Sequence, residues 1–335
     1  MDPRQEPMTV IGAGSWGTAL AIQLAREGRL TYLWGRDHEH LLAMRDARRN
    51  ARYLPAAAFP AALTIETDLG TALRSARDVI VAVPSHAFRA ALARIAPDLR
   101  ADARIAWATK GFELETGLLP HEVARAVLGN RPTAVLSGPT FAKEVGAGLP
   151  TAMTIASRDA NFGDTLAQSI SGPTFRAYTQ TDITGVEVGG AVKNVIAIGT
   201  GIADGMGFGS NTRVALITRG LAEMMRLGVA LGARRETFMG LAGLGDLVLT
   251  CTDDQSRNRR FGIALGKGAT LNAAAAEIDQ VVEGVPAARA VHDVAARHGV
   301  DMPICHEVYR ILHEGRSVRA AVQTLMGREM RSEAE

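Results

Sequence analysis

The chain has 335 residues, which is enough for about two domains with separate hydrophobic cores. Its 47% hydrophobic and 21% charged residues are ordinary for a globular protein, and a net charge of +2 gives no reason to expect a nucleic-acid or membrane partner. No uninterrupted apolar run reaches the roughly 18 residues of a membrane helix, and no signal sequence precedes the first strand. Cys251 and Cys305 are too few for a disulfide framework. We therefore expect a cytoplasmic protein.

A glycine-rich turn opens the folded part of the sequence. Residues 8–12 (MTVIG) predict a buried strand, and the GxGxxG pattern of Gly12, Gly14 and Gly17 leads from it into a helical pattern. The first glycine permits the tight turn, the second lets the backbone approach a pyrophosphate, and the third allows close packing of helix and strand. An ordinary glycine turn is the alternative, but the strand–turn–helix context favours a dinucleotide site with the pyrophosphate at the helix N-terminus.

The next predicted strand, residues 30–34, ends in Gly35-Arg36-Asp37. An acidic residue at this position binds the ribose 2′-hydroxyl of NAD, whereas an arginine suits the 2′-phosphate of NADP. Arg36 therefore favours NADP(H). Asp37 keeps NAD(H) open, and Arg36 could instead stack on the adenine or face water.

Strand and helix patterns then alternate up to about residue 180. The sequences LTIE, DVIVAVP, RIAWATKG, TAVLSGP, TAMTIAS and FRAYT predict strands of a mostly parallel, doubly wound sheet. Ligands bind such sheets beyond the C-terminal ends of the strands, which directs attention to residues 83–85, 109–111 and 137–140. Lys110 is either a cation above cofactor or substrate or a solvated lysine of the turn.

Residues 138–143 (GPTFAK) predict a rigid turn into a short helix, with Thr140 able to cap it. Such a turn presents backbone N–H groups to a ligand. Lys143 is expected on the exposed face of this helix.

Helical periodicity dominates after Tyr178, over residues 182–206, 211–231, 257–267 and most segments beyond 273. The strand-like patch DLVLTC at Asp246 is too isolated to form a sheet. The expected fold is α/β, with an N-terminal Rossmann-like doubly wound sheet in a dinucleotide-binding domain, residues 1–185. An all-helical substrate and catalytic domain follows, residues 186–335.

The stretch VGGAVKN, residues 188–194, stands near this boundary and contains Lys193. The chain has only four lysines against thirty-three arginines, so each lysine invites a specific explanation. On a helix Lys193 shares a face with Gly189, Gly190 and Ala197, which leave space for a ligand. Apolar neighbours would desolvate the amine and lower its pKa towards that of a useful base. Tight helix packing explains the glycines equally well, and a surface lysine is the simpler alternative.

Three later segments carry polar groups suited to a ligand. Gly243-Leu244-Gly245-Asp246 presents a carboxylate that could hold a hydroxyl or orient a lysine. Ser256-Arg257-Asn258-Arg259-Arg260 opens a helix with Ser256 as its cap, and its N–H groups and arginine suit a phosphate monoester, unless the arginines form a solvated face. Gln280-Val281-Val282-Glu283-Gly284 predicts a turn whose Glu283 could reach a ribose. All eight histidines fall before residue 122 or after residue 291, which disfavours a histidine proton relay, and no compact metal-binding cluster is present.

Together these motifs resemble the bacterial type of NAD(P)-dependent glycerol-3-phosphate dehydrogenase. The matching stretches run in family order from about residue 9 to residue 284: VIGAGSWGTALA, VPSH, WATKG, SGPTFAKE, GGAVKNVIAIG, GFGSNTRVALITRGLAEM, GLAGLGDLVLTCT, SRNRRFG and VVEG. The segment after Gly284 matches loosely and holds no proposed catalytic residue.

The resemblance implies that the chain interconverts sn-glycerol 3-phosphate and dihydroxyacetone phosphate for phospholipid synthesis, with Lys193 as proton donor or acceptor. It implies cofactor contacts beyond the glycines at Ser15, Trp16, Arg36, Lys110, Ala142, Arg257, Val281 and Glu283. It implies substrate contacts at Lys110, Gly138, Thr140, Lys193, Asp246, Ser256, Arg257 and Asn258. The expected partner is a small phosphorylated molecule, with a second copy of the chain in a homodimer left open.

Two alternatives remain at this stage. One is another NADP-dependent reductase of a small hydroxy or keto acid, against which the phosphate-suited residues 256–260 argue. The other is a nicotinamide-binding redox sensor without catalysis, which would need neither Lys193 nor Asp246.

Overall fold

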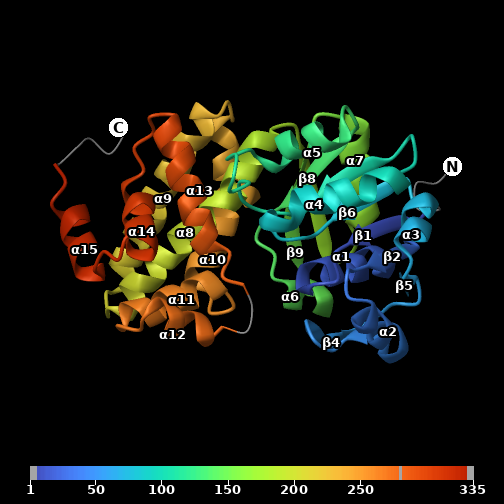
Figure 1. Ribbon diagram of the computed structural model, residues 1–335, viewed down its shortest axis with the longest axis horizontal. Helices are drawn as coiled ribbons and strands as arrows, with labels where there is room; N and C mark the ends of the chain where they lie inside the picture. The colour runs from blue at the N-terminus through green and yellow to red at the C-terminus, as the bar shows by residue number, and fades with distance from the viewer. Residues whose placement is uncertain (1–5, 279–280, 330–335) are drawn as a thin grey trace. The chain divides into compact units, whose positions relative to one another are not determined.

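The computed structural model describes residues 6–278 and 281–329 (Figure 1). By their internal packing these residues divide into two compact units. The sheet unit comprises Met1–Gly190 and Ala233–Asp246, and the helical unit comprises Ala191–Gly232 and Leu247–Glu335. The functional division at residues 185 and 186 stays a prediction beside this packing boundary.

The sheet unit contains a large sheet and a small hairpin. The strands are β1 (Met8–Ile11), β2 (Thr31–Trp34), β3 (Arg49–Asn50), β4 (Leu54–Ala58), β5 (Leu63–Ile65), β6 (Asp78–Val81), β7 (Arg104–Trp107), β8 (Thr133–Ser137), β9 (Thr151–Ser157) and β10 (Phe175–Gln180). The eight-stranded sheet has the order β10-β9-β8-β7-β6-β1-β2-β5, and only β8 and β9 pair antiparallel. This confirms the predicted mostly parallel, Rossmann-like sheet. The antiparallel pair β3–β4 was not predicted, because its strands, RN and LPAAA, contain no β-branched residue.

Helices cover the sheet and build the rest of the chain. They are α1 (Ser15–Arg26), α2 (His38–Ala47), α3 (Leu69–Ser75), α4 (Ser85–Ile95), η2 (Ala96–Asp98), α5 (Pro120–Leu128), α6 (Ala142–Ala147), α7 (Ala160–Ile170), α8 (Ile183–Gly205), α9 (Ser210–Ala230), η3 (Arg235–Met239), η4 (Leu241–Gly245), α10 (Asp246–Thr252), α11 (Arg257–Gly266), α12 (Leu271–Ala276), α13 (Gly284–Arg297), α14 (Pro303–His313) and α15 (Val318–Met326).

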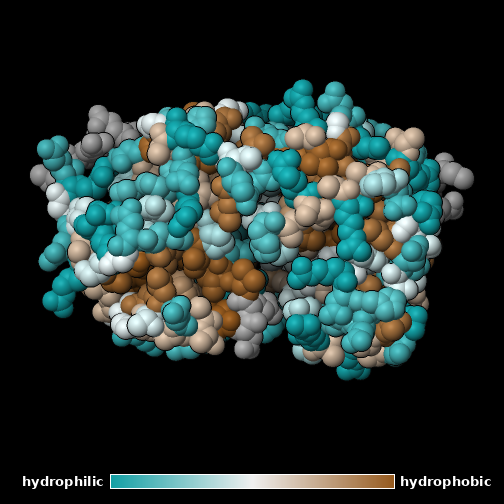
Figure 2. Space-filling model, in the orientation of Figure 1, coloured by the Kyte–Doolittle hydropathy of each residue, from teal (hydrophilic) through white to brown (hydrophobic). Residues whose placement is uncertain are grey.

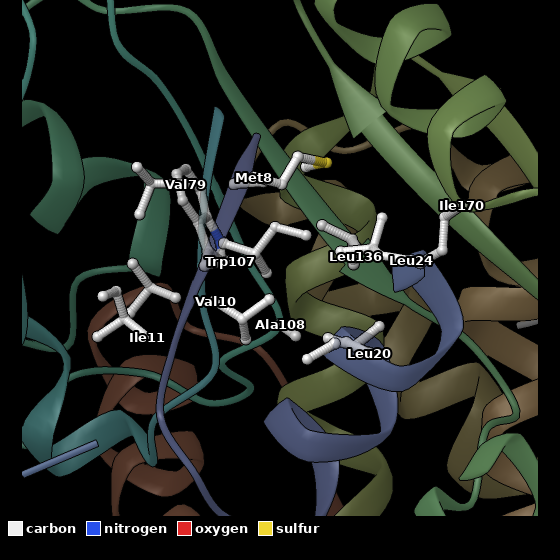
Figure 3. Close-up of a cluster of buried hydrophobic side chains, with 14 of the residues drawn as sticks. Met8, Val10, Ile11, Leu20, Leu24, Val79, Trp107, Ala108, Leu136 and Ile170 are labelled. Atoms are coloured by element: carbon white, nitrogen blue, oxygen red, sulfur yellow. The ribbon is translucent and has the colours of Figure 1, made fainter. Parts of the chain in front are cut away.

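The central strands are buried over their whole length. All four residues of β1, β6 and β7 are buried, as expected for parallel strands covered by helices on both faces. Figure 3 shows Val10 of β1 on the side of Leu20 and Leu24 of α1, and Ile11 on the opposite side of the strand. The register aligns the ends of neighbouring strands, because Ile11 pairs with Val81 and Val81 pairs with Trp107. The loops that follow these strands therefore leave the sheet at one edge.

Helix α8 is long and apolar enough to cross a membrane by length and composition alone, although 94% of the relevant window is buried. The prediction from uninterrupted apolar runs overlooked it, because Glu187 and Lys193 interrupt the run. A buried helix with charged side chains at hydrogen-bonded positions matches a core helix. Hydrophilic side chains cover much of the face visible in Figure 2, with a hydrophobic area between α14 and α11.

The helical unit confirms the predicted all-helical second part. Close approaches between helices rest on glycines: a Cβ on Gly201 would lie 2.2 Å from the Arg259 carbonyl oxygen, and one on Gly262 would lie 2.2 Å from that of Ile198. These contacts hold α8 against α11. The DLVLTC patch forms helix α10, since a short, mostly apolar run does not by itself distinguish a strand from a buried helix.

Candidate active site

The glycine turn after β1 has the geometry that its sequence predicts. Gly12 has φ 117°, and a Cβ there would lie 2.4 Å from the Ala82 carbonyl oxygen. A Cβ on Gly17 would lie 1.9 Å from the Gly12 carbonyl oxygen, so the helix packs closely on the turn. By contrast, a Cβ on Gly14 would meet no atom within 4 Å. Because no side chain caps α1, its first N–H groups and the open space at Gly14 fit a pyrophosphate.

Ser15 and Trp16 begin α1 and are partly buried, and Trp16 packs against the core of the sheet unit. Arg36 is exposed after β2. Its neighbour Asp37 is the N-cap of α2, with Oδ1 accepting a hydrogen bond from the His40 N–H at 3.0 Å. The carboxylate that would bind a ribose hydroxyl thus has a structural partner, whereas Arg36 extends from the same turn.

The ends of β6, β7 and β8 bring several predicted residues to one edge of the sheet. Thr109 Oγ1 donates a hydrogen bond to the Val83 carbonyl oxygen at 2.7 Å, which joins two of these loops. After β8, Gly138 has φ 149°, and a Cβ there would lie 3.0 Å from Met153 Cα. The turn therefore needs a glycine to pass β9.

The predicted cap at Thr140 is wrong. Phe141 occupies the N-cap of α6, and Thr140 Oγ1 instead donates to the Gly138 carbonyl oxygen at 3.3 Å. The hydroxyl is used inside the turn because the chain enters the helix one residue later than expected. Ala142 begins α6, and Lys143 is exposed on it, as predicted.

Lys110 and Asp246 form an ion pair that joins segments 136 residues apart. Lys110 Nζ lies 2.6 Å from Asp246 Oδ2, and the side chains are 16% and 2% exposed. Asp246 follows η4, a single π-helical turn that contains Gly243 and Gly245. The glycine loop therefore orients a lysine, which was one of the two roles expected for its carboxylate.

The first half of α8 forms a wall beside this pair. A Cβ on Gly190 would lie 3.3 Å from Cγ and 3.4 Å from Cδ of Lys110. A Cβ on Gly189 would lie 2.4 Å from the Ala242 carbonyl oxygen in η4. The expectation that these glycines leave a ligand space beside Lys193 is thus wrong, because the stem of Lys110 and the backbone of η4 pack on them.

Glu187, one turn earlier on α8, is buried with three hydrogen bonds. Its Oε1 accepts from Trp107 Nε1 at 2.9 Å and from the His121 N–H at 3.0 Å, and its Oε2 lies 2.6 Å from His121 Nδ1. Burial raises the pKa of Glu187 although His121 opposes the shift. Burial lowers the pKa of His121, but the hydrogen bond and charge of Glu187 outweigh it, and the net direction is upward. The pair therefore holds a proton between the two groups readily.

Lys193 lies in the helical unit, near the middle of α8. It is only 8% exposed, and its Nζ donates a hydrogen bond to Thr250 Oγ1 at 3.1 Å. The alternative of a surface lysine is excluded. A buried amine held by a hydroxyl is a suitable group for proton exchange.

The N-terminus of α11 also follows the prediction. Ser256 caps it, with Oγ accepting from the Arg259 N–H at 3.2 Å. Asn258 is buried, donates to Asn194 Oδ1 at 2.9 Å and accepts from the Gly284 N–H at 2.8 Å. One amide thus ties together α8, α11 and α13.

The three arginines of this segment have different surroundings. Arg257 is partly buried and donates from Nη1 to the Val281 carbonyl oxygen at 3.1 Å. Arg259 is buried with carboxylate partners, and Arg260 is exposed. A single solvated arginine face is therefore excluded.

Arg257 is brought to the predicted turn before α13. Val281 is exposed there, and Glu283 is partly buried as the N-cap of α13. Gln280 of the same turn lies outside the described residues.

Three of these hydrogen-bond partners were not predicted from the sequence: Glu187, Asn194 and Thr250. Thr250 and Asn194 lie inside two of the stretches that resemble the dehydrogenase family. Their hydroxyl and amide groups could have indicated hydrogen-bond partners for the site residues. Glu187 had a weaker signal, an acidic residue in an apolar helix. Among the described residues, no group of three or more His, Cys, Asp or Glu side chains could hold a metal ion.

Comparison with known proteins identifies the family. The models of the NAD-dependent glycerol-3-phosphate dehydrogenase N-terminus and C-terminus match residues 7–163 and 182–323. The chain is 56% identical to the glycerol-3-phosphate dehydrogenase [NAD(P)+] of Shigella boydii over 99% of both chains, and equally to that of Escherichia coli. The crystal structure of glycerol-3-phosphate dehydrogenase from Coxiella burnetii has a TM-score of 0.93 and 48% identity, covering 96% of this chain and 99% of that one. The chain therefore belongs to the NAD-dependent glycerol-3-phosphate dehydrogenase family.

Proposed function

We propose that this protein interconverts sn-glycerol 3-phosphate and dihydroxyacetone phosphate with a nicotinamide cofactor. The observation that carries the proposal is the buried Lys193, held by Thr250, in a chain 56% identical to enzymes with this named activity. The bound cofactor supplies or accepts the hydride at the substrate C2. The protein must then bind, orient and exchange one proton.

We assign the proton exchange to Lys193. In the reducing direction its ammonium group donates a proton to the C2 oxygen, and in the oxidising direction its neutral amine accepts that proton. Lys110, fixed by Asp246, stabilises the negative charge that develops on the same oxygen. The reaction requires both lysines to reach one substrate.

The remaining roles are binding roles. Gly138, Thr140, Ser256, Arg257 and Asn258 contact the substrate, with the N-terminus of α11 suited to its phosphate. Holding the phosphate orients the reacting carbon, which is how binding far from the reaction centre accelerates the chemistry. The cofactor contacts are those of the glycine turn together with Ser15, Trp16, Arg36, Lys110, Ala142, Arg257, Val281 and Glu283.

The test is the consumption of NADPH with dihydroxyacetone phosphate. Lys193→Ala should lower kcat by at least about 100-fold, as expected for a lost acid and base, while NADPH binding is kept. Lys267→Ala, at an exposed lysine of the same unit, is the control and should retain wild-type kcat. Near-normal turnover of Lys193→Ala would remove Lys193 from the reaction. A wild-type preference for a carboxylate substrate, or tight NADPH binding without turnover, would favour the two alternative functions.

We also propose a preference for NADP(H) over NAD(H). It is supported by the exposed Arg36 and by the use of Asp37 as a helix cap. Arg36→Ala should lower the NADPH/NADH ratio of kcat/KM about tenfold, since it removes one charge-assisted contact to the 2′-phosphate. An unchanged ratio would show that Arg36 does not select the cofactor.

Three further expectations belong to the same proposal. The reaction would take place in the cytoplasm and supply the glycerol backbone of phospholipids. Rescue of a bacterial strain that requires sn-glycerol 3-phosphate for growth would check that supply, and failure would contradict it. A homodimer stays a prediction, which light scattering of the purified chain can check.

A further inference from the structure

Glu187 stands apart from the residues assigned so far because its hydrogen bonds join three elements of the sheet unit. It belongs to α8, while its partners Trp107 and His121 belong to the end of β7 and the first turn of α5. It is 3% exposed. A carboxylate at this depth is costly to bury, and its three hydrogen bonds offset part of that cost.

The contacts of Glu187 are directional, whereas an apolar side chain would only fill space. Trp107 Nε1 and the His121 backbone N–H converge on Oε1, and His121 Nδ1 meets Oε2. Three hydrogen bonds to two elements fix the rotation of this helical turn about its axis and its position along that axis. Satisfied buried networks of this kind specify one arrangement of the elements they join.

The arrangement that is fixed includes the Lys110–Asp246 pair. Trp107 precedes Lys110 by three residues on the same strand end. Gly190, one turn after Glu187, packs on the stem of Lys110, and Gly189 packs on η4, which directly precedes Asp246. Both members of the ion pair therefore rest on the helical turn that Glu187 holds.

We propose that Glu187 is a positioning residue for the Lys110–Asp246 ion pair. By anchoring the first half of α8 to Trp107 and His121, Glu187 holds Gly189 and Gly190 at the position along the helix axis where Lys110 and Asp246 form their ion pair. Its catalytic consequence rests on the proposed function, because it acts through Lys110. A misplacement of about 1 Å in such a group can cost about 100-fold in rate.

The first test reads the position of Lys110 without any substrate. The chain has four lysines, so selective ¹³C labelling of lysine Cε gives at most four groups of NMR signals. Lysine-to-arginine variants assign them, and Asp246→Asn shows where the Lys110 signal moves when the ion pair is lost. In Glu187→Ala the Lys110 signal should move towards that position, while the exposed Lys143 and Lys267 signals stay in place.

Matched variants separate positioning from general damage. Glu223→Gln alters another buried carboxylate with two backbone hydrogen bonds, but in the helical unit, and should leave the Lys110 signal unchanged. Glu187→Gln keeps an oxygen for Trp107 Nε1 and His121 N–H and should restore most of the wild-type signal. If Glu187→Ala does not fold, Trp107→Phe removes one donor and should produce a smaller shift in the same direction. An unmoved Lys110 signal in folded Glu187→Ala or Trp107→Phe would overturn the proposal.

The second test is kinetic. Glu187→Ala should lower kcat/KM for dihydroxyacetone phosphate at least about tenfold, and Glu187→Gln should recover most of the loss. Because Glu187 acts through the ion pair, the double variant Glu187→Ala/Asp246→Asn should have a kcat/KM no lower than that of Asp246→Asn alone. Losses that multiply would contradict the proposal and indicate a separate structural role. A wild-type chain without turnover would contradict the proposed function instead, and the NMR test would still decide the role of Glu187.

Discussion

Each of the two units contains an aspartate that lies between two arginines and whose side chain is at most 9% exposed, yet the two clusters lie in different relations to the proposed active site. In the sheet unit, Asp78 binds Arg104 through two hydrogen bonds of 2.6 and 2.8 Å and lies 3.5 Å from Arg29. In the helical unit, Asp204 lies 2.7 Å from Arg259 and 2.8 Å from Arg213. The chemistry is the same, so the difference must come from what each cluster holds in place.

The Asp78 cluster lies at the edge of the sheet opposite the proposed site. Asp78 and Arg104 are the first residues of β6 and β7, whereas Lys110 follows the last residue of β7. The cluster fixes the beginnings of strands and touches no predicted ligand residue. Its role is therefore structural.

The Asp204 cluster is part of the proposed phosphate site. Arg259 belongs to the first turn of α11, directly after Ser256, Arg257 and Asn258. Asp204 thereby fixes the helix N-terminus that we assign to the phosphate. The comparison teaches that a buried ion pair indicates function only through the elements that it positions.

Removing Asp78 should have the largest effect on stability. Asp78→Ala removes the carboxylate that lies between Arg29 and Arg104, which are 1% and 6% exposed, and should destabilise the sheet unit by about 3–5 kcal/mol. All three tryptophans (Trp16, Trp34 and Trp107) belong to this unit, so urea unfolding followed by tryptophan fluorescence measures it selectively.

The control for this variant is Asp102→Ala, which removes an exposed partner of Arg100 and should cost under about 1 kcal/mol. The folded fraction of Asp78→Ala should keep the wild-type KM for dihydroxyacetone phosphate. A raised KM in Asp78→Ala would contradict the purely structural role that we assign to the Asp78 cluster.

Glu223 shows a third way to bury a carboxylate, without an arginine among its hydrogen-bond donors. It is 1% exposed and accepts from the N–H groups of Ile304 and Cys305 at 2.7 and 3.0 Å. Burial raises the pKa of Glu223 to about 7, and the two N–H donors oppose the shift without overcoming it. The folded state therefore binds a proton that the unfolded state releases at lower pH.

This shift predicts that the helical unit loses stability as pH rises from about 4.5 to about 7, by about 3 kcal/mol at most. Glu223→Gln does not titrate and should lack that part of the pH dependence. The measurement is the difference between the two proteins in urea unfolding by circular dichroism across this pH range. Parallel stability curves for wild type and Glu223→Gln would show that the carboxylate does not titrate there.

The sequence predicts the sheet and helices of this chain because most of them are long periodic segments with clear boundaries. The glycine turn is predicted residue by residue, since each glycine answers a separate steric demand. Short or ambiguous segments are not: LPAAA forms a strand, DLVLTC forms a helix, and Thr140 bonds within its own turn. In each case tertiary contacts, rather than local preference, decide the conformation.

The sequence predicts the individual residues of the site, but not which of them contact one another. Lys110 and Asp246 each stood out, but nothing local joins residues 136 apart, and Gly190 could not be matched to the stem of Lys110. Arg259 shows the same limit. In the sequence it is one of three similar arginines, and only the packing of α8 on α11 distinguishes it from Arg260.

Removing Asp204 should affect both stability and binding, each moderately. Asp204→Ala leaves Arg259 with Asp254 as partner and should cost about 1–3 kcal/mol. Because the first turn of α11 loses an anchor, the KM for dihydroxyacetone phosphate should rise about tenfold, the equivalent of one weakened charge-assisted hydrogen bond. Hydrogen exchange of residues 257–266 should become faster, whereas that of β6 and β7 should not change. A wild-type KM in Asp204→Ala would remove the functional difference between the clusters.

Removing Arg213, the more exposed arginine of the Asp204 cluster, should change stability and KM least. It also shows which contact of Asp204 causes the larger effect of Asp204→Ala. Arg213 is 29% exposed in its side chain, whereas Arg259 is 9% exposed, so water screens the Arg213 pair more strongly. Arg213→Ala should therefore cost under about 1 kcal/mol and leave the KM for dihydroxyacetone phosphate unchanged, because the Asp204–Arg259 bonds persist. Urea unfolding and steady-state kinetics, run beside Asp204→Ala, measure both quantities. A KM that rises as far as in Asp204→Ala would mean that the phosphate site depends on the charge of the whole cluster rather than on the anchoring of α11 by Arg259.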